Sequence, residues 1–519
     1  MGYQVLIPCA GTGSRLFEET KFINKSLVHL NNMPIISHIL EKFPKDCQFI
    51  IPVGYKSADL IDYLKIAHSE LDIIIEEVFP FEGPGSSLGF TLSKVLHHIN
   101  QPFVFISCDT LITDPIPAPN ENWIGFSKVI DSSNYATIDI DDQGIKSINK
   151  KLDSESLNAY IGLSGINDYE KFKELAKNND RNFIEEAECY PISQMLSVFK
   201  PIEFSWFDTG NIPSLHNTRK VFEENDKKLF NILEKENEKI WFTNDKVIKF
   251  SDDKDFILNR IKRADLLKQY VPKIIDIKSN MYSYKFTEGD VLSSKINMDL
   301  FKKLLDNLAE FWDEKTLSDA ETIEFYQLCF EFYKDKTFSR VESFMLKYPY
   351  SNKEIYLNGK SIEPPFVSLE KIDWNYLSKG IAVNFHGDLH FENILLSNEG
   401  KFVFLDWRQS FNGKLDFGDI YYDLAKLLHG ILLPHEIVNK GGYEIIESEN
   451  TVTININIPH ENIEIAKYFQ QWCNENHYDY KKIRLLCSLI YLNIASLHHH
   501  PYSKFLFYYG LEMLNNNNE

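Results

Sequence analysis

Several short segments of the chain carry glycines, cations or carboxylates in patterns suited to phosphate groups. The first is the turn Gly11-Thr12-Gly13-Ser14, which follows an apolar strand and leads into Arg15. Small residues let backbone N–H groups approach phosphate oxygens, and the guanidinium can neutralise them. The dinucleotide-binding pattern fails because Leu16 occupies its third glycine position, and the P-loop pattern fails because Asn24 precedes Lys25-Ser26. Taken alone, the turn is a weak indication.

Carboxylates and one amide occur in two further groups. In the first half of the chain, Asp109 ends the apolar segment FISCD, and Asp208 lies within SWFDTG. In the second half, Asp388 and Asn393 lie together in HGDLHFENILL, and Asp406 ends the next apolar segment. Mg²⁺ binds few carboxylates plus substrate phosphate oxygens, and phosphate transfer from ATP also needs an acceptor for the hydroxyl proton. Both groups therefore indicate phosphate chemistry that uses Mg²⁺.

Short apolar strands alternate with helical patterns over the first ~110 residues. These elements would position the carboxylates of the first half of the chain, Asp109 and Asp208. Strands too apolar to alternate, such as FVFISCD, indicate a parallel sheet covered by helices on both faces. Candidate strands in NWIGFSKVI, YATIDID and PIEFSWFD extend this sheet. The charged, helix-prone segment 223–239 contains neither glycine nor proline, and we interpret it as the connector between two domains.

The second group follows a different pattern. Two short strands flank Thr243-Asn244-Asp245, a helix and the strands KIIDI and MYSYKF come next, and long helical stretches follow. A small sheet lobe and a large helical lobe form a second fold. We assign the last part of the chain, beyond residue 430, as the remainder of the helical lobe.

Composition limits the class of protein and its partners. A chain of 519 residues should contain several domains. Its formal charge of −20 repels polyanions, so we expect neither nucleic acid nor a membrane as a partner. We find no apolar stretch of the ~20 residues that a membrane helix needs. The seven dispersed cysteines, without a CxxC pair, indicate reduced thiols, and we expect a cytoplasmic protein.

The segments CAGTGSRL, INKSLVHLNNMPIISHIL, FISCDTLI and SWFDTGNIPSL, in this order, resemble the signature of the sugar-phosphate nucleotidyltransferases. The resemblance implies that Arg15 and Lys25 are catalytic and that Asp109 and Asp208 bind Mg²⁺. It assigns nucleotide binding to Ala10, Gly11, Thr12, Gly13, Ser14 and Gly85, and binding of the second substrate to Gly162 and Glu186. Asn24 replaces the family's usual proline, and Cys108 its usual glycine. A glycosyltransferase of related fold is the alternative, but it would not need Arg15 and Lys25.

The segments NFHGDLHFENILL, KFVFLDWRQSF and LDFGDIYYDLAKLLHG resemble the aminoglycoside phosphotransferase and choline kinase superfamily. The resemblance implies that Asp388 is the catalytic base, that Asn393 and Asp406 bind Mg²⁺, and that Lys249 contacts the phosphates of ATP. The sheet lobe departs from the family, since we find no glycine-rich loop before Lys249 and no glutamate in the following helix to pair with it. These departures leave open a domain that binds without transferring phosphate.

The acceptor of the second domain is less defined. Choline kinases hold their cationic substrate with acidic and aromatic groups, and the residue two positions after the metal aspartate is commonly acidic. Arg408 stands there in this chain and is assigned to substrate binding. It favours a neutral or anionic sugar or polyol over a cationic acceptor, although a salt bridge from Arg408 to Asp416 or Asp419 explains it equally well.

We therefore predict an α/β chain of two domains. Residues 1–222 form a Rossmann-like nucleotidyltransferase domain with a mixed, mostly parallel sheet, residues 223–239 a helical linker, and residues 240–519 a two-lobed α+β kinase-like domain. Its N-lobe covers about 240–292 and its C-lobe 293–519.

The predicted function is bifunctional. ATP phosphorylates a small alcohol, and CTP, UTP or another triphosphate then activates the phosphate, releasing pyrophosphate. The family implies that such precursors enter surface polysaccharides. Two alternatives remain: activation of an amino alcohol phosphate by CTP together with its kinase, and a nucleotidyltransferase with a non-catalytic binding module. The partners are thus an NTP, ATP and an alcohol or its phosphate, and a homo-oligomer is left open.

Overall fold

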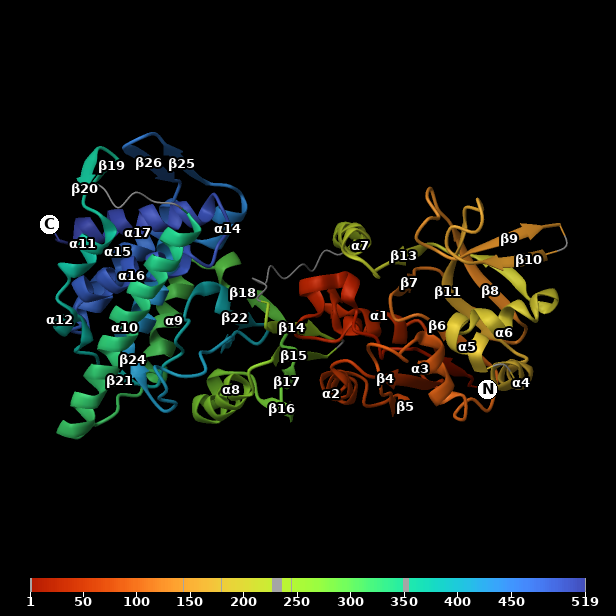
Figure 1. Ribbon diagram of the computed structural model, residues 1–519. Helices are drawn as coiled ribbons and strands as arrows, with labels where there is room; N and C mark the ends of the chain where they lie inside the picture. Colours follow the sequence, from red (N-terminus) through yellow and green to blue (C-terminus); the bar gives the residue numbers. More distant parts are fainter. Residues whose placement is uncertain are drawn as a thin grey trace. The chain divides into compact units, whose positions relative to one another are not determined.

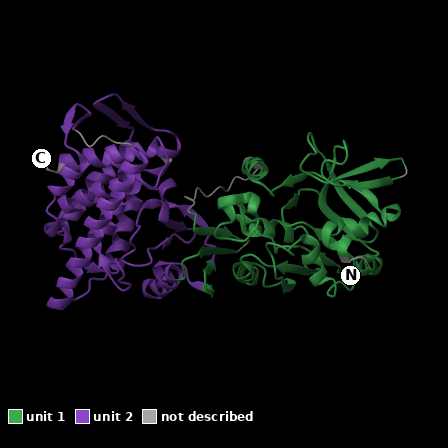
Figure 2. Cartoon of the chain, viewed as in Figure 1, with its two compact units in different colours: residues 1–254, 275–284 green, residues 255–274, 285–519 purple. Residues whose placement is uncertain are grey.

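The computed structural model describes residues 2–142, 144–178, 180–225, 236–243, 245–348 and 354–518. The chain forms two compact units, which are described separately (Figure 2). Unit 1 consists of Met1–Lys254 and Ile275–Tyr284, and unit 2 of Asp255–Ile274 and Lys285–Glu519. The centre of the predicted linker, 226–235, lies outside the described residues.

Unit 1 is built on a nine-stranded mixed sheet (Figure 1). Four neighbouring strands run parallel and are, in spatial order, β5 (Asp72–Glu77), β4 (Gln48–Val53), β1 (Gln4–Leu6) and β6 (Phe103–Ile106). The strands beyond β6 pair mainly antiparallel and are β11 (Asn158–Ile166), β8 (Trp123–Lys128), β9 (Thr137–Asp141), β10 (Gly144–Asn149) and β12 (Lys200–Glu203), of which β12 runs parallel to β8. The predicted mixed α/β sheet is confirmed.

The parallel strands carry apolar side chains on both faces. Successive residues of a strand point to opposite sides of the sheet, so Val5 and Leu6 of β1 enter two separate apolar clusters. The helices α1 (Ile35–Leu40) and α2 (Ser57–Ala67) contribute to the cluster of Val5. The helices α3 (Leu88–Val95), α4 (Tyr169–Asn178) and α5 (Asp180–Glu186) contribute to the cluster of Leu6. Because helices cover both faces of the sheet, the carboxyl ends of β1 and β6 are held rigidly. The glycine turn follows the end of β1, and Asp109 follows the end of β6.

A second sheet follows the predicted linker and has the order β14-β15-β17-β16. Its strands are β14 (Glu238–Phe242), β15 (Lys246–Ser251), β17 (Met281–Lys285) and β16 (Ile274–Ile277). Trp241 is fully buried and meets Tyr63 of α2 edge-on, with ring centroids 5.1 Å apart. Ile248, Phe250 and Met281 belong to the same apolar cluster as Val5. Most of the strands expected in the kinase N-lobe thus share the core of unit 1, so the compact units follow a division different from the predicted domains, whose boundaries stay a prediction.

Unit 2 is mainly helical. Its long helices include α9 (Met298–Phe311), α10 (Asp319–Lys347), α13 (Ile420–Leu432), α15 (His460–Glu475), α16 (Tyr480–Ala495) and α17 (Tyr502–Asn518) (Figure 1). The start of α10 is fixed by a capping box, in which Ser318 and Glu321 exchange hydrogen bonds. The helix α13 is buried over almost its whole length, and α16 packs against it and against α10 and α17. The buried α13 carries polar side chains, Asp423 and Lys426, that contact residues 386–388.

The assignment of everything beyond residue 430 to the helical lobe is wrong in one segment. Residues Tyr443–Glu447 (β25) and Thr451–Ile456 (β26) form an antiparallel hairpin that joins β19 (Ile355–Leu357) and β20 (Lys360–Ile362) in a four-stranded sheet. The alternation in TVTINI explains it, because Val452 and Ile454 are buried while Thr451, Thr453 and Asn455 are exposed. This period of two favours a strand over a helix.

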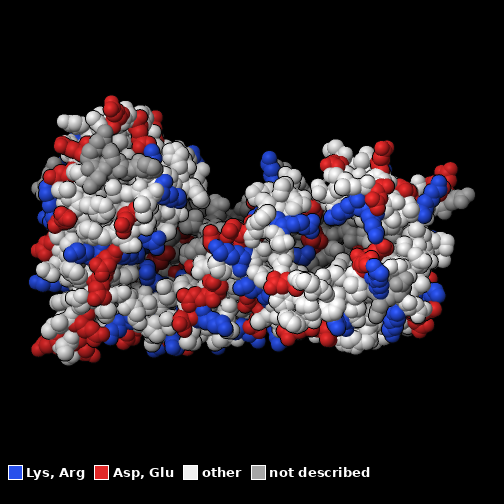
Figure 3. Space-filling model, in the orientation of Figure 1, with Lys and Arg blue, Asp and Glu red and all other residues white. Residues whose placement is uncertain are grey.

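The surface carries both signs of charge. In the view of Figure 3, basic and acidic side chains are interspersed, with acidic ones in excess in the sequence as a whole. In the described part of the chain, no helix has the length and apolar character required to cross a membrane.

Candidate active sites

The glycine turn of unit 1 lies beside Lys25. Gly13 has a φ of 67°, and a Cβ at this position would lie 2.8 Å from the Cβ of Lys25. Glycine therefore meets two requirements here, a left-handed backbone and a close approach. Leu16 N donates to Gly13 O at 2.8 Å and starts the short helix η1 (Ser14–Thr20), which begins with Ser14 and Arg15. By contrast, Gly11 has open space around it, and Ala10 O accepts a hydrogen bond from Tyr55 N.

Asn24, in place of the family's proline, holds the segment before Lys25. Its side chain is buried and donates to Cys9 O at 3.0 Å and to Tyr55 O at 2.6 Å. Its Oδ1 accepts hydrogen bonds from Ser26 N and Ser26 Oγ, which caps the helix η2 (Lys25–Leu27). The amide thus fixes Lys25 by hydrogen bonds where a proline would fix it by ring geometry. The substitution is visible in the sequence, but these hydrogen bonds are not, because Cys9 and Tyr55 lie 15 and 31 residues away from Asn24.

The two carboxylates of unit 1 converge on Gly210. The strand β13 (Trp206–Asp208) pairs antiparallel with β7 (Thr110–Ile112), and this register sets Asp208 opposite Thr110, next to Asp109. A Cβ built on Gly210 would lie 3.1 Å from an oxygen of Asp109, 3.1 Å from an oxygen of Asp208 and 3.4 Å from a guanidinium nitrogen of Arg15. The structure therefore brings together three predicted residues that lie far apart in the sequence.

Lys25 joins the same group. Its Nζ lies 3.1 Å from Asp109 Oδ2. Burial alone would lower the pKa of Lys25, but the Asp109 carboxylate and Cys108 outweigh it and raise the pKa above its usual value. Burial would raise the pKa of Asp109, yet Lys25 and Arg15 lower it overall. Both side chains are therefore charged at neutral pH.

Asp208 is oriented by three donors. Gly210 N donates to its Oδ1 at 2.8 Å, and Tyr135 OH and Asn211 Nδ2 each donate to its Oδ2 at 3.1 Å. Two oriented carboxylates with no sulfur or imidazole ligand in the set fit a hard cation such as Mg²⁺. Tyr135 was not foreseen, because its contact with Asp208 depends on a loop between β8 and β9.

Of the remaining predicted residues of unit 1, Gly162 lies close to the segment of Asp109, whereas Gly85 and Glu186 have no contact with the two carboxylates in the described residues. Gly162, with a φ of 66°, lies against the turn before Asp109, since a Cβ there would be 2.6 Å from Ser107 Oγ. Gly85 is an exposed loop glycine with a φ of 88°. Glu186 forms an ion pair with Lys150 at 2.9 Å, and in the described residues no hydrogen bond or ion pair links it to the carboxylates. Gly162 is thus brought to the site, whereas Gly85 and Glu186 stay predictions.

A buried glutamate was missed two residues beyond Glu186. Glu188 is 4% exposed and accepts a hydrogen bond from Tyr160 OH at 3.3 Å, while its Oε2 has no partner. Burial raises the pKa of Glu188 to about 7. Its neighbours in the apolar cluster include Phe183 and Ile192.

This burial predicts a pH-dependent stability of unit 1. The folded state binds the Glu188 proton more tightly than the unfolded state does. The free energy of unfolding is therefore highest below about pH 4.5, and it falls by roughly 3 kcal/mol as pH rises toward about 7. Glu188→Gln should remove this loss, so that its stability relative to wild type rises between pH 5 and pH 8. Urea unfolding, followed by hydrogen exchange of peptides from β11, measures the difference. Glu186→Gln serves as the control, and an equal effect of both variants would refute the assignment.

In unit 2, α13 holds the segment before Asp388 in place. His386 N and Gly387 N each donate to the Asp423 carboxylate at 2.7 Å, and Trp312 Nε1 donates to it at 3.2 Å. Asp423 is fully buried, and burial raises its pKa to about 6. At the start of α13, Asp419 caps the helix and accepts from Tyr333 OH at 2.6 Å. The backbone before Asp388 is therefore fixed by buried hydrogen bonds.

Asp388 lies in a network of polar side chains. Lys426 Nζ lies 2.8 Å from Asp388 Oδ1, and Asn393 Nδ2 donates to Asp388 Oδ2 at 3.2 Å. His390 Nε2 lies 3.7 Å from Oδ2. Burial would raise the pKa of Asp388, but Lys426 and His390 lower it well below its usual value. The carboxylate is therefore ionised, and the amide of Asn393 turns its N–H groups toward Asp388, leaving its oxygen for a cation.

Asp406 has an unexpected partner. It adopts a left-handed backbone, with a φ of 58°, and its Oδ1 lies 2.5 Å from a guanidinium nitrogen of Arg260. Arg260 belongs to α8 (Lys254–Leu267), the helix in which the sequence offered no glutamate. The oxygens of Asn393 and Asp406 fit Mg²⁺ in ligand type, but a cation at Asp406 must share this carboxylate with Arg260.

A second arginine of α8 connects the loops around this site. Arg263 is 1% exposed and donates to the carbonyls of Phe385, Arg408 and Leu415. Its guanidinium also lies over the Phe385 ring at 3.8 Å. Both arginines were missed, because their partners lie more than a hundred residues away in the sequence.

Two further predicted residues of the kinase-like domain are placed as follows. Lys249 lies on β15 and is mostly buried, within unit 1, whereas Asp388, Asn393 and Asp406 belong to unit 2, so its contact with ATP stays a prediction. Arg408 forms no ion pair with Asp416 or Asp419 in the described residues; it lies over the Phe332 ring at 4.9 Å. The salt-bridge explanation of Arg408 is therefore wrong.

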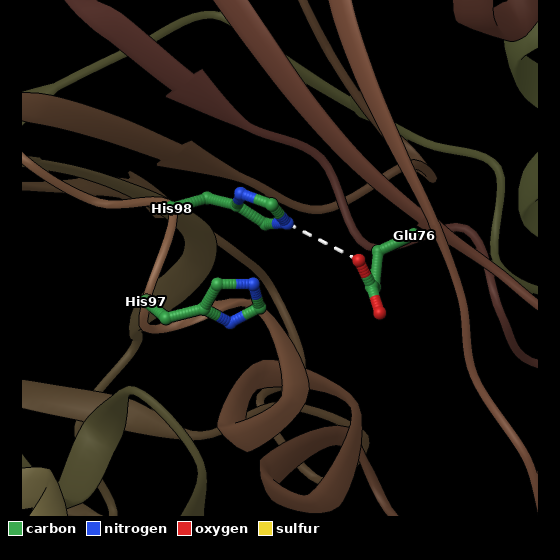
Figure 4. Close-up of side chains that lie close together, drawn as sticks. All are labelled: Glu76, His97 and His98. Carbon is green, nitrogen blue, oxygen red and sulfur yellow. Dashed lines mark hydrogen bonds and ion pairs between the residues drawn. The ribbon is translucent and has the colours of Figure 1, made fainter.

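One other group of side chains in the described residues has the composition of a metal site. The ligand atoms of Glu76, His97 and His98 lie within 4.8 Å of one another, and His98 Nε2 contacts Glu76 Oε2 at 3.1 Å (Figure 4). The two imidazole ring centroids lie 3.9 Å apart, and the ring planes are tilted by 40°. An imidazole binds a metal ion in its ring plane, and two rings with centroids this close meet by their faces, not by their nitrogen edges. We therefore assign no metal ion here.

Comparisons with known proteins confirm the two resemblances at the level of class. Residues 369–439 match the model of the phosphotransferase enzyme family. The N-terminal region matches the protein named bifunctional protein GlmU of Methanococcus vannielii, with 28% identity over 138 residues, which are 26% of this chain and 32% of that protein. The corresponding protein of Methanococcus maripaludis is 27% identical over 165 residues, 31% of this chain and 38% of that protein. The chain thus spans about a third of the length of these relatives.

Solved structures match the same region. One is the CTP:phosphocholine cytidylyltransferase LicC of Streptococcus pneumoniae, with 17% identity, a TM-score of 0.38, and coverage of 43% of this chain and 99% of that chain. Another is the UDP-glucose pyrophosphorylase from Acinetobacter baumanii, with 15% identity, a TM-score of 0.36, and coverage of 44% and 96%. By sequence, the chain combines an N-terminal region similar to nucleotidyltransferases with a segment, residues 369–439, that matches the model of the phosphotransferase enzyme family.

Proposed function

We propose that the chain is a bifunctional transferase. The kinase-like domain transfers the γ-phosphate of ATP to a hydroxyl of a small sugar or polyol. The nucleotidyltransferase domain then couples the new phosphate to a nucleotide from CTP or UTP. The observation that carries the proposal is the convergence of Arg15, Asp109 and Asp208 on Gly210, with Lys25 bound to Asp109, in a chain that also holds Asp388 in a polar network.

In the nucleotidyltransferase domain, a phosphate oxygen of the ester attacks the α-phosphorus of the triphosphate, and the bond from this phosphorus to the pyrophosphate oxygen breaks. Mg²⁺, when bound by Asp109 and Asp208, supplies positive charge to the phosphate oxygens. Lys25 and Arg15 stabilise the charge that develops on the leaving pyrophosphate. The ion pair with Asp109 keeps Lys25 protonated, because it opposes the loss of the ammonium proton.

In the kinase-like domain, the acceptor oxygen attacks the γ-phosphorus, the bond to the β-phosphate oxygen breaks, and ADP leaves. Asp388 accepts a hydrogen bond from the hydroxyl and receives its proton as the new bond forms. Its low pKa makes it a weak base, so it orients the hydroxyl early and takes the proton late in the reaction. Lys426 neutralises the carboxylate, which reduces repulsion of the incoming phosphate.

A second candidate function is a nucleotidyltransferase whose kinase-like domain binds without transferring phosphate. The ion pair between Asp406 and Arg260 favours it, because a guanidinium already satisfies the carboxylate that would bind Mg²⁺. Activation of an amino alcohol phosphate receives less support, since Lys336, Arg408 and Lys426 surround the region next to Asp388 with positive charge.

As further parts of the proposal, the enzyme acts in the cytoplasm, with all seven cysteines free, and supplies precursors of a surface polysaccharide.

Phosphorus NMR tests the proposal with the full-length protein, Mg²⁺, ATP, each further triphosphate and a panel of sugars, polyols and amino alcohols. We expect a phosphomonoester signal with ATP and an acceptor, followed by a diphosphodiester signal when CTP or UTP is added. Pyrophosphate formation from an added phosphate ester, without phosphorylation of any free alcohol, would favour the binding-module alternative. Absence of both signals would refute the proposal.

A further inference from the structure

Two aromatic rings, Phe332 and Tyr422, support a cluster of cations that is linked to Asp388 through Lys426. Lys336, on α10, donates to Tyr422 OH at 3.3 Å, and its Nζ lies over the Phe332 ring at 4.5 Å. Arg408 lies over the same Phe332 ring at 4.9 Å. Tyr422 is four residues before Lys426 on α13, on the same face of the helix. The three cations Lys336, Arg408 and Lys426 are thus connected through Phe332 and Tyr422.

The cluster has more positive than negative charge. Lys426 pairs with Asp388 at 2.8 Å, whereas the described residues provide no ion pair for Lys336 or Arg408. Three cations therefore face one carboxylate. Burial lowers the pKa of Lys336, and the nearby Arg408 and Lys426 lower it further, although Tyr422 opposes this. Burial would raise the pKa of Tyr422, but Lys336, Lys426 and Arg408 outweigh it and lower the pKa.

Like charges held together in a largely buried place repel each other unless an anion joins them. The backbone around Arg408 is fixed by Arg263, which donates to Arg408 O, so relaxation of this segment is limited. The acceptor hydroxyl must reach Asp388, and Lys426 links Asp388 to this cluster. A short acceptor that binds at Asp388 can therefore place a second group at Lys336 and Arg408.

We propose that Lys336 and Arg408 form an anion-binding subsite for the acceptor, which therefore carries a carboxylate or a phosphate besides the hydroxyl that is phosphorylated. This inference rests on the proposed kinase function and narrows its substrate class to hydroxy acids and polyol phosphates. The planar guanidinium of Arg408 suits bidentate binding of either group, and the ammonium of Lys336 adds a point charge. Binding of the γ-phosphate of ATP is the competing role for these cations.

The experiment compares acceptors that differ only in the anion: glycerol, glycerate and glycerol 1-phosphate, and glucose, gluconate and glucose 6-phosphate. We expect kcat/KM for the anionic member of one series to exceed that of its neutral analogue at least about 10-fold. The carboxylate and phosphate arms distinguish the two sources of negative charge. Equal rates for neutral and anionic acceptors would overturn the subsite while leaving the kinase function intact.

Variants separate the acceptor from the nucleotide. Arg408→Met and Lys336→Met should each raise KM for the anionic acceptor about 10- to 100-fold, with KM for ATP changed less than about two-fold. Arg408→Lys should restore part of the affinity. Lys334→Met, on the same helix but over the Phe330 ring, is the matched control. A rise in KM for ATP instead would assign the cations to the nucleotide and refute the proposal.

If the wild-type protein phosphorylated none of these acceptors, the kinase function would be refuted. A direct binding measurement would then still test the subsite. Calorimetric titration of glycerate, glycerol 1-phosphate, gluconate and glucose 6-phosphate into the full-length protein without ATP then tests the subsite alone. Binding that is lost in the Arg408→Met variant supports the subsite. No binding of these compounds, or equal binding by wild type and the variant, refutes it.

Discussion

Asp388→Asn should lower ATP-dependent phosphorylation of the alcohol by about a thousand-fold, because it removes the acceptor for the hydroxyl proton. The same variant should form the nucleotide conjugate from an added phosphate ester at the wild-type rate. The substitution also leaves Lys426 without its ion pair, so the thermal unfolding of the variant must be compared with that of wild type. Steady-state assays of the two half-reactions, each with its own substrate, provide the measurement.

Asp416→Asn is the matched control for this experiment. Asp416 is exposed and lies in the loop before α13, so its loss should leave both activities unchanged. If Asp388→Asn phosphorylated the alcohol as fast as wild type, the kinase function would be wrong. The kinase-like domain would then be a binding module, as the contact between Arg260 and Asp406 also suggests.

The reciprocal variant, Asp109→Asn, should reduce nucleotide conjugate formation by about two to four orders of magnitude. Its carboxylate is a proposed Mg²⁺ ligand and also the partner of Lys25, so charge is lost at two points of the site. Phosphorylation of the free alcohol should continue, and the phosphate ester should accumulate. Phosphorus NMR follows both products in one sample.

Asp142→Asn, in the exposed turn between β9 and β10, controls for a general effect of removing a carboxylate from unit 1. Loss of both activities in a folded Asp109→Asn protein would contradict two independent sites. An unchanged rate of conjugate formation would remove Asp109 from the catalytic residues.

The sequence predicted those parts of the sites that lie next to regular elements. Asp109 follows an apolar strand, Asp208 lies in a short motif, and both were expected to bind one metal; the structure brings them to the same glycine. The pairing of β7 with β13 explains this, since two short strands with an antiparallel register bring distant segments together. A local sequence pattern is therefore enough to predict a site residue when the end of a strand determines where its side chain lies.

The sequence did not predict the partners that come from distant elements. Arg260 and Arg263 read as ordinary charged residues of a helix, and Tyr135 as a loop residue. Their roles depend on which loops pack against them, and a pattern of apolar residues does not contain this information. The same reason applies to Trp241: its strand pattern predicts that it is buried, but not that Tyr63 of α2 covers it.

The core shared by Trp241, Met281 and Val5 has a consequence for synthesis on the ribosome. Unit 1 ends only with Ile275–Tyr284, after the segment Asp255–Ile274 that belongs to unit 2. Translation proceeds at about 5–20 residues per second, so β17 emerges some seconds after the rest of unit 1. During this interval the apolar cluster that contains Val5 and Trp241 lacks Met281, and the nascent chain is open to aggregation or to chaperones. A gene divided after residue 222 would remove Trp241, Ile248 and Met281 from this apolar cluster, so we expect the separated first part to expose Tyr63 and to aggregate more readily than the whole chain.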